Sequence, residues 1–275
     1  MSGPGESLAS MLKVERRGDD EFVVRLEDFW GASMGCDVLA RASLAAVATC
    51  AGKELYALQA SFFDSAPAAV PLQLRVERLS DQDQIAHRLV RVRHGERSLC
   101  DVILTFAAPG GELAYQGVRP EGDLPRADAV PSTLERARAE GWEEYARGPV
   151  EFRRVGAEWP WPKPSPSETS HHREWLRPRQ PLPGDASMQM AALVFASDFY
   201  SHWTASDRLG ADFAPNRFTS LDHALWIHRH LPWDGWWLLD AASEVGHAGR
   251  MLTRRRLFTD TGILIASAVQ SGRYL

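Results

Sequence analysis

The same order of predicted elements occurs twice along the chain, about 163 residues apart. A leading strand near 21–27 precedes a small apolar helix at 34–50. A second leading strand near 172–178 precedes a long apolar helix at 187–204. Four alternating strands follow each helix, at 55–64, 71–79, 85–94 and 97–107 in the first copy and at 218–230, 236–245, 250–258 and 263–273 in the second. A repeat of this kind indicates two copies of one structural unit.

Both predicted helices are apolar on nearly every face, so each must be buried on most of its sides. An antiparallel sheet wrapped around such a helix is the hotdog fold, and two copies can pair their sheets so that the joined edges are shielded. The pattern therefore predicts an α+β double hotdog with units at 1–108 and 169–275. The connector between them, 109–168, contains the Pro-rich run WPWPKPSPS and one predicted helix at 131–146. A linker is favoured there over a lid that closes on a ligand.

Composition excludes several classes of protein. With 44% hydrophobic and 24% charged residues, the chain is neither disordered nor a coiled coil in the main. No apolar run approaches the roughly 20 residues that span a bilayer, and the N-terminus shows no secretory signal. Cys36, Cys50 and Cys100 form no CxxC pair, which suits a reducing cytoplasm. A net charge of −5 argues against a nucleic-acid partner. We expect a cytoplasmic protein.

Asp198 is the most informative single residue, because it lies in the middle of the apolar helix predicted at 187–204. An ionised carboxylate in apolar surroundings is costly without hydrogen-bond partners. Asp198 therefore either opens onto a polar pocket or holds a neighbouring loop. Ser220, at the start of a predicted strand, and Gln270, in the last predicted strand, indicate little when each is taken alone.

Together, the strings SDFY, TSLDHALWIHR and LIASAVQSG resemble the acyl-CoA thioesterase II family, the TesB-like double-hotdog enzymes. In that family a helix Asp, a Ser or Thr before a Leu/Ile-Asp-His run and a Gln in the final strand bind the hydrolytic water. The resemblance implies that Asp198, Ser220 and Gln270 are the catalytic set. It also implies hydrolysis of an acyl-CoA thioester to free acid and CoA, with no cofactor and no metal. An acyl carrier protein thioester is a second candidate substrate, and a homodimer or tetramer is expected by analogy.

The repeat indicates that the first copy lacks this set. Ala107 stands at the place that matches Gln270, and Tyr56 stands near the place that matches Ser220. The first helix has no carboxylate after Asp37. We therefore expect one active site per chain, with the first unit as scaffold and part of the acyl-binding surface.

Thioester hydrolysis needs a base, because water must lose a proton as it attacks. A carboxylate in reach of the water typically contributes about 10²–10⁴-fold. A hydroxyl and a carboxamide can hold the water in line with the carbonyl carbon. Backbone N–H groups at the N-terminal end of the buried helix are natural donors to the oxyanion. The sequence leaves open a second route, in which Asp198 attacks and forms a covalent anhydride.

Other polar groups carry weaker hypotheses. His171, His172 and the pair at 228 and 230 lack a third metal ligand at a recognisable spacing. His223 follows Asp222 in the family motif, and a structural hydrogen bond near the site is expected for it. The triple arginine at 254–256 could meet CoA phosphates, but strand alternation divides it between two faces, and a solvated face is favoured.

Two rival functions stay open. A hotdog hydratase or dehydratase would need an Asp and a His on one loop-helix segment, whereas Asp185 precedes its helix without such a His. A non-catalytic double hotdog would only bind acyl-CoA or an acyl carrier protein. The first copy keeps this reading open, because it has SMGCDVLA at 33–40 and FFDSAPA at 62–68 where the family has a Gly-Gly-Gln-like and a Phe-Leu-Arg-Pro-Gly segment.

Overall fold

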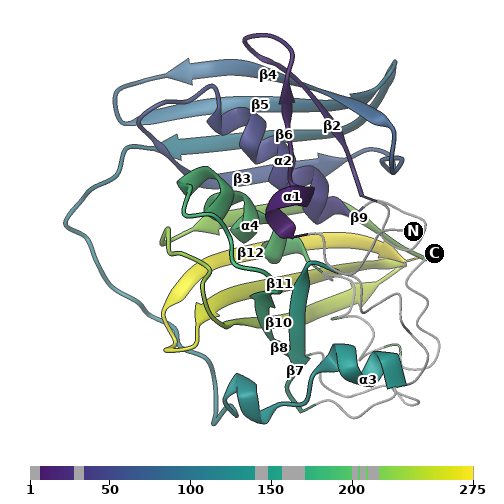
Figure 1. Ribbon diagram of the computed structural model, residues 1–275, viewed down its shortest axis with the longest axis vertical. Helices are drawn as coiled ribbons and strands as arrows, with labels where there is room; N and C mark the ends of the chain where they lie inside the picture. The colour runs from purple at the N-terminus through teal and green to yellow at the C-terminus, as the bar shows by residue number, and fades with distance from the viewer. Residues whose placement is uncertain are drawn as a thin grey trace.

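The computed structural model describes residues 7–27, 34–139, 148–156, 171–199, 204, 209 and 217–274. Its strands form one twelve-stranded antiparallel sheet (Figure 1). Six strands come from the first half of the chain: β1 (Glu15–Arg16), β2 (Glu21–Arg25), β3 (Glu54–Phe62), β4 (Pro71–Asp81), β5 (Ile85–His94) and β6 (Arg97–Ala107). Six come from the second: β7 (Val150–Arg154), β8 (His171–Pro178), β9 (Phe218–Ile227), β10 (Trp237–His247), β11 (Arg250–Thr259) and β12 (Leu264–Tyr274).

The strand order shows the repeat directly. One half of the sheet runs β1-β2-β4-β5-β6-β3 and the other runs β7-β8-β10-β11-β12-β9 from its own outer edge. The halves join where β3 pairs antiparallel with β9, with Leu58 opposite Leu225. The predicted double hotdog, with sheets paired edge to edge, is therefore confirmed, and the pairing removes two edges that would otherwise be exposed.

Local sequence explains the strands well. Along β5 and β6 the inward positions are buried and, apart from Arg88, apolar, whereas most outward positions are charged, polar or partly exposed, the alternation expected of a sheet with one face on a core. These two strands have the bounds that the sequence predicted. Their hairpin turns at Gly95, whose φ of 58° lies in the left-handed region that glycine adopts without strain.

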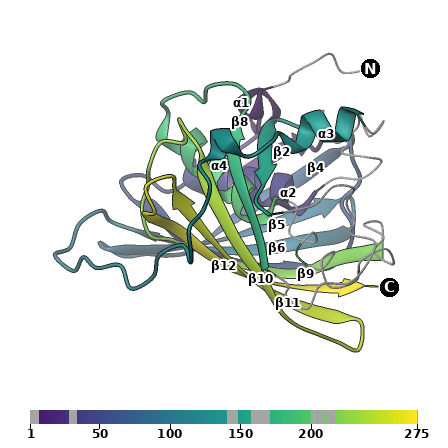
Figure 2. The same ribbon diagram turned by 90° about the horizontal axis from the view of Figure 1, so that it is seen from below.

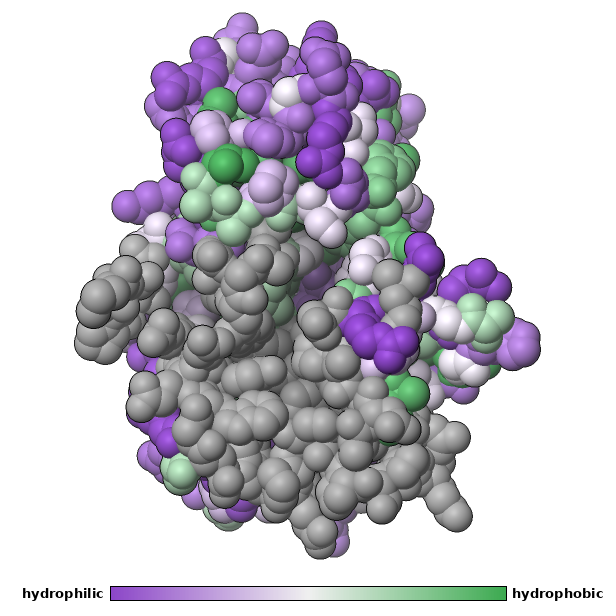
Figure 3. Space-filling view, turned by 90° about the vertical axis from the view of Figure 1, so that its right-hand side faces the viewer, coloured by the Kyte–Doolittle hydropathy of each residue, from purple (hydrophilic) through white to green (hydrophobic). Residues whose placement is uncertain are grey.

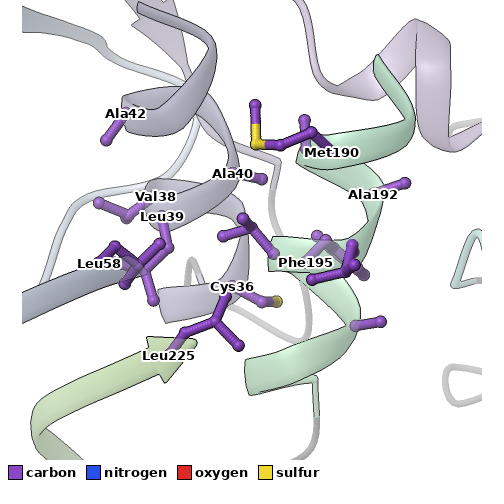
Figure 4. Close-up of a cluster of buried hydrophobic side chains, with 14 of the residues drawn as sticks. Cys36, Val38, Leu39, Ala40, Ala42, Leu58, Met190, Ala192, Phe195 and Leu225 are labelled. Carbon is purple, nitrogen blue, oxygen red and sulfur yellow. The ribbon is translucent and has the colours of Figure 1, made fainter. Parts of the chain in front are cut away.

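Two helices of equal length, α2 (Gly35–Val47) and α4 (Ala186–Asp198), lie side by side against one face of the sheet (Figures 1 and 2). The α2 side of their contact includes the small residue Ala40, and Figure 4 shows the Cys36 thiol extending from α2 toward α4. Small side chains allow the helix axes to approach closely. One core therefore contains residues from both halves of the chain.

The predicted connector contains more structure than a linker. β7 falls inside it and extends the sheet by pairing with β8, and α3 (Thr133–Ala139) matches part of the helix expected at 131–146. The short helix α1 (Leu8–Met11), the 3₁₀ turn η1 (Ala127–Ala129) and β1 were also not predicted. The Pro-rich run at 159–167 lies outside the described residues.

The surface of the first half is hydrophilic where Figure 1 places β4 and β5, at the top of the molecule (Figure 3). Outward residues of β4, such as Gln73 and Arg75, account for part of this polarity. Among the described residues, no helix has the length and apolar character needed to cross a membrane.

Candidate active site

Asp198 is the last residue of α4 and not, as the sequence predicted, the middle of a longer helix. Phe199 leaves the helical conformation, with ψ at 124°, and residues 200–203 lie outside the described part. The Asp198 side chain is buried, with 4% of its residue surface exposed. The C-terminal end of a helix carries partial negative charge, so a buried carboxylate there needs compensation from other elements.

The start of α2 supplies one such compensation. A Cβ built on Gly35 would lie 2.7 Å from Asp198 Oδ2, so the carboxylate rests against the first residue of α2. Burial raises the pKa of the neighbouring Cys36 thiol, and the negative charge of Asp198 raises it further. The positive end of the α2 dipole therefore lies beside the Asp198 carboxylate.

This arrangement corrects the expected source of oxyanion donors. The N-terminal end of α4 lies about 18 Å from Asp198 at 1.5 Å per residue, too far to act at the same site. The helix start beside Asp198 is that of α2, at Gly35 and Cys36. The first half of the chain thus contributes directly to the environment of the carboxylate.

Ser220 and Gln270 meet on neighbouring strands. The Gln270 side-chain amide donates a hydrogen bond to Ser220 Oγ over 2.9 Å between Nε2 and Oγ. The pairing of β9 with β12 shifts register between Ser271 and Gly272. This irregularity accompanies the approach of Ser220 to Gln270, which is 2% exposed.

His223 lies between this pair and Asp198. It is the register partner of Gln270 across β9 and β12, and its Nδ1 atom is 3.9 Å from Asp198 Oδ1. Its Nε2 atom is 3.0 Å from Ser197 Oγ, a hydroxyl that donates to the Val194 carbonyl. Since that hydroxyl proton is already used, the network assigns the His223 proton to Nε2 and leaves Nδ1 as an acceptor.

Burial keeps this histidine neutral. The His223 side chain is fully buried, and burial lowers its pKa below the usual range, although the charge of Asp198 and the Gln270 side chain partly oppose the shift. The sequence expectation of a hydrogen-bonding role near the site agrees with these contacts.

Three buried polar atoms in this region share one property. Asp198 Oδ1, His223 Nδ1 and Gln270 Oε1 have no hydrogen-bond partner among the described residues. Asp198 Oδ1 and Gln270 Oε1 are acceptors by their chemistry, and His223 Nδ1 is one by its tautomer. Buried acceptors require donors, and a water molecule has two hydrogens to give. The arrangement can therefore hold a polarised water next to a base.

Arg255 was wrongly placed on a solvated face. It is 1% exposed and donates to the carbonyl oxygens of Ser197 and Phe199, on either side of Asp198. Burial lowers the pKa of its guanidinium to about 10, so it stays charged at neutral pH. The alternation of β11 was the available signal, since it places Arg254 outward, paired with Glu244, and Arg255 inward.

The remaining candidates lie elsewhere or have other roles. Asp185 is exposed and caps α4 by accepting a hydrogen bond from Met188 N at 2.9 Å. Tyr56 is 48% exposed at an irregular position of β3, and Ala107 ends β6. His171 contacts Asp240. Within the described ranges, no three His, Cys, Asp or Glu residues are grouped so as to hold a metal ion.

Two hotdog units around paired helices, with a buried carboxylate where one helix ends against the start of the other, place the chain among the double-hotdog proteins. The sequence matches two family models, the acyl-CoA thioesterase N-terminal domain over residues 35–108 and the acyl-CoA thioesterase C-terminal domain over residues 122–274. The chain belongs to the TesB-like acyl-CoA thioesterase II family, and it is a thioester hydrolase that acts on acyl-CoA.

Individual relatives agree over nearly the whole length. Acyl-CoA thioesterase 2 of Haemophilus influenzae is 25% identical over 99% of this chain and 98% of its own. The solved structure of acyl-CoA thioesterase II TesB2 from Mycobacterium marinum superposes with a TM-score of 0.78 at 24% identity, covering 98% of both chains. A TesB protein of Mycobacterium avium subsp. paratuberculosis gives 0.77 at 22% identity and the same coverage. At these identities the two structures support the shared fold.

Proposed function

We propose that Asp198, Ser220 and Gln270 bind and activate the water that hydrolyses the acyl-CoA thioester. The observation that carries this proposal is the group of three buried acceptors, Asp198 Oδ1, His223 Nδ1 and Gln270 Oε1, without partners among the described residues. A water that donates to such acceptors has its oxygen lone pair turned outward, toward a substrate carbonyl.

Each group then has a defined task. Asp198 accepts the proton of the attacking water, while Gln270 and Ser220, joined by their 2.9 Å hydrogen bond, fix the position of the water. The bond from the water oxygen to the carbonyl carbon forms, the C–S bond breaks, and CoA leaves as a thiol after taking up the proton. Backbone N–H groups at the start of α2 stabilise the oxyanion.

Direct attack by water is favoured over a covalent Asp198 intermediate. Asp198 Oδ2 rests against Gly35 and Oδ1 faces His223 at 3.9 Å, so neither oxygen is open on all sides to a bulky thioester carbonyl. A single turnover in ¹⁸O-labelled water tests the covalent route. Direct attack is expected to place the label in the product acid alone, and label recovered in the Asp198 side chain would establish an anhydride whose Asp198 carbonyl is attacked by water.

The central test replaces Asp198 by Asn and measures release of CoA thiol. Loss of the base is expected to lower kcat by about 10²–10⁴-fold while circular dichroism and the melting temperature show a folded protein. Asp185→Asn, which changes a carboxylate at the exposed end of the same helix, serves as the matched control. Near-full activity in Asp198→Asn would remove the assignment.

The finer features of the function are proposals as well. The first unit lacks the catalytic set and serves as scaffold, apart from the start of α2. A carrier-protein thioester is a second candidate substrate. Hydrolysis rates of matched acyl-CoA and acyl carrier protein substrates compare the two.

Compartment and oligomeric state are further proposals. The free, buried Cys36, Cys50 and Cys100 fit a reducing cytoplasm. Exposed Tyr56 and Ile103 on adjacent strands fit a homodimer or tetramer, which light scattering measures.

A further inference from the structure

An arginine holds the end of the central helix in each half of the protein. In the first half, Arg88 of β5 donates to Thr49 O and Thr49 Oγ1, both at 3.0 Å, just beyond the end of α2. In the second half, Arg255 of β11 donates to Phe199 O at 2.6 Å and to Ser197 O, at the end of α4. Both arginines are 1% exposed. A guanidinium satisfies the carbonyls that every helix leaves unpaired at its C-terminal end.

The two arginines differ in what balances their charge. The carboxylate paired with Arg88 is Asp81, 2.6 Å away, whose side chain is 52% exposed at the surface. The carboxylates that act on Arg255 are Asp198 and Glu174, which are 4% and 0% exposed. Arg88 thus links its helix to the protein surface, whereas Arg255 is a buried cation beside two buried carboxylates.

Glu174 belongs to a separate buried pair behind the site. It lies on β8 with an oxygen 3.1 Å from His172 Nε2. Burial opposes ionisation of Glu174, yet the charges of His172, Arg154 and Arg255 lower its pKa below the usual value. Glu174 therefore stays ionised and compensates Arg255 in part, so that the charge of Arg255 is shared between Glu174 and Asp198.

The groups around Asp198 come from five elements. The titratable side chains that interact electrostatically with Asp198 are Cys36 of α2, Cys100 of β6, His223 of β9 and Arg255 of β11, and Gln270 of β12 does not titrate. The two thiols and the neutral imidazole carry no positive charge at neutral pH. Among the described residues in this set, Arg255 is the cation beside Asp198.

We propose that Arg255 is the positioning residue for the catalytic base: it fixes the backbone on both sides of Asp198 and places a buried positive charge beside the carboxylate. This inference rests on the proposed role of Asp198. The fork of the guanidinium spans two carbonyls, and the residue between them carries the base. A shift at either carbonyl moves the carboxylate away from His223 and Gln270, where the water is held.

The test compares Arg255→Met with Arg88→Met, a matched loss of a buried arginine at the other helix end. Arg255→Met is expected to lower kcat by about 10²-fold through misplacement of the base, with KM little changed. Arg88→Met is expected to lower the melting temperature and leave kcat and KM unchanged.

Two further variants separate folding from positioning. Glu174→Gln combined with Arg255→Met removes the buried cation together with one of its two buried carboxylates, and should recover part of the melting temperature without recovering kcat. Arg255→Lys keeps the charge but not the fork, and should keep the melting temperature near that of the parent protein while losing part of kcat.

The outcomes separate a failure of the inference about Arg255 from a failure of the proposed function. Equal kcat in Arg255→Met and Arg88→Met, with Asp198→Asn inactive, would overturn the inference and leave the proposed function intact. An active Asp198→Asn would overturn the proposed function itself.

Discussion

Gly35 and Asp198, 163 residues apart in the chain, are close enough that a single methyl group on Gly35 would lie 2.7 Å from the Asp198 Oδ2 atom. Real Cβ atoms do not come this near to a neighbour. The start of α2 and the end of α4 are therefore fitted to each other around one carboxylate, and the glycine at this position is required by space.

Gly35→Ala should impair catalysis more than folding. The new Cβ would also lie 3.2 Å from Phe62 Cζ, so the carboxylate must move, and a misplaced base costs about 10²-fold in kcat. The measurement is kcat for acyl-CoA beside the melting temperature. Gly235→Ala is the control, since its Cβ would meet no atom within 4 Å, and an equal loss in both variants would contradict the fit.

Ser220 and Gln270 should act as a coupled pair. Each alanine substitution removes one partner of the 2.9 Å hydrogen bond, and the double variant should lose less activity than the sum of the single losses by about 0.5–1.5 kcal/mol. A double-mutant cycle on kcat/KM measures this coupling. Strict additivity would show that the two side chains act independently.

Stability should fall as the pH is lowered past 6.5, the usual pKa of histidine. The pKa of buried His223 lies below 6.5, so between the two pKa values the unfolded state binds more protons, and stability rises with pH there. His223 thus contributes fully above pH 6.5, and its contribution is lost as the pH falls toward the folded pKa.

The measurement for this prediction is urea unfolding between pH 7.5 and 5, above the range in which Glu174 titrates. His223→Gln should flatten the slope of unfolding free energy against pH. His247→Gln, at an exposed position of β10, should not. An unchanged slope in His223→Gln would mean that another group sets the acid sensitivity.

Asp185→Ala should affect stability and spare the reaction. Its carboxylate caps α4 through the 2.9 Å bond to Met188 N, and loss of such a cap costs about 1 kcal/mol. A lower urea midpoint with unchanged kcat is expected. If kcat fell sharply instead, the acid at the start of the helix would have a chemical role, as the hydratase or dehydratase reading requires.

Hydrophobic periodicity predicted the elements whose own residues show a clear alternation. β5 and β6 alternate along most of their length and are joined by a two-residue turn, so their bounds follow from local sequence. The end of α4 does not follow from local sequence, because the aromatic residues Phe199 and Tyr200 come directly after Asp198. In the structure, Arg255 contacts the Ser197 and Phe199 carbonyls where the helix stops.

Sequence strings typical of the family identified the candidate site residues, but they did not identify the residues that surround them. Asp198, Ser220 and Gln270 are recognisable in sequence, whereas the approach of Gly35 depends on how two helices 151 residues apart pack. β7 was missed because five residues in a Pro-rich segment carry too short an alternation to stand out, and pairing with β8 makes them a strand.

The seam between β3 and β9 has a consequence for how such a chain can change. An antiparallel join of corresponding strands is what a twofold axis produces. The two halves of this single polypeptide are therefore arranged like the two subunits of a symmetric dimer. In a dimer of identical subunits, every substitution would change both helix junctions at once. In a single chain the two junctions can differ: the carboxylate is needed only at the end of α4, and the first half needs to supply only the start of α2 that lies beside it.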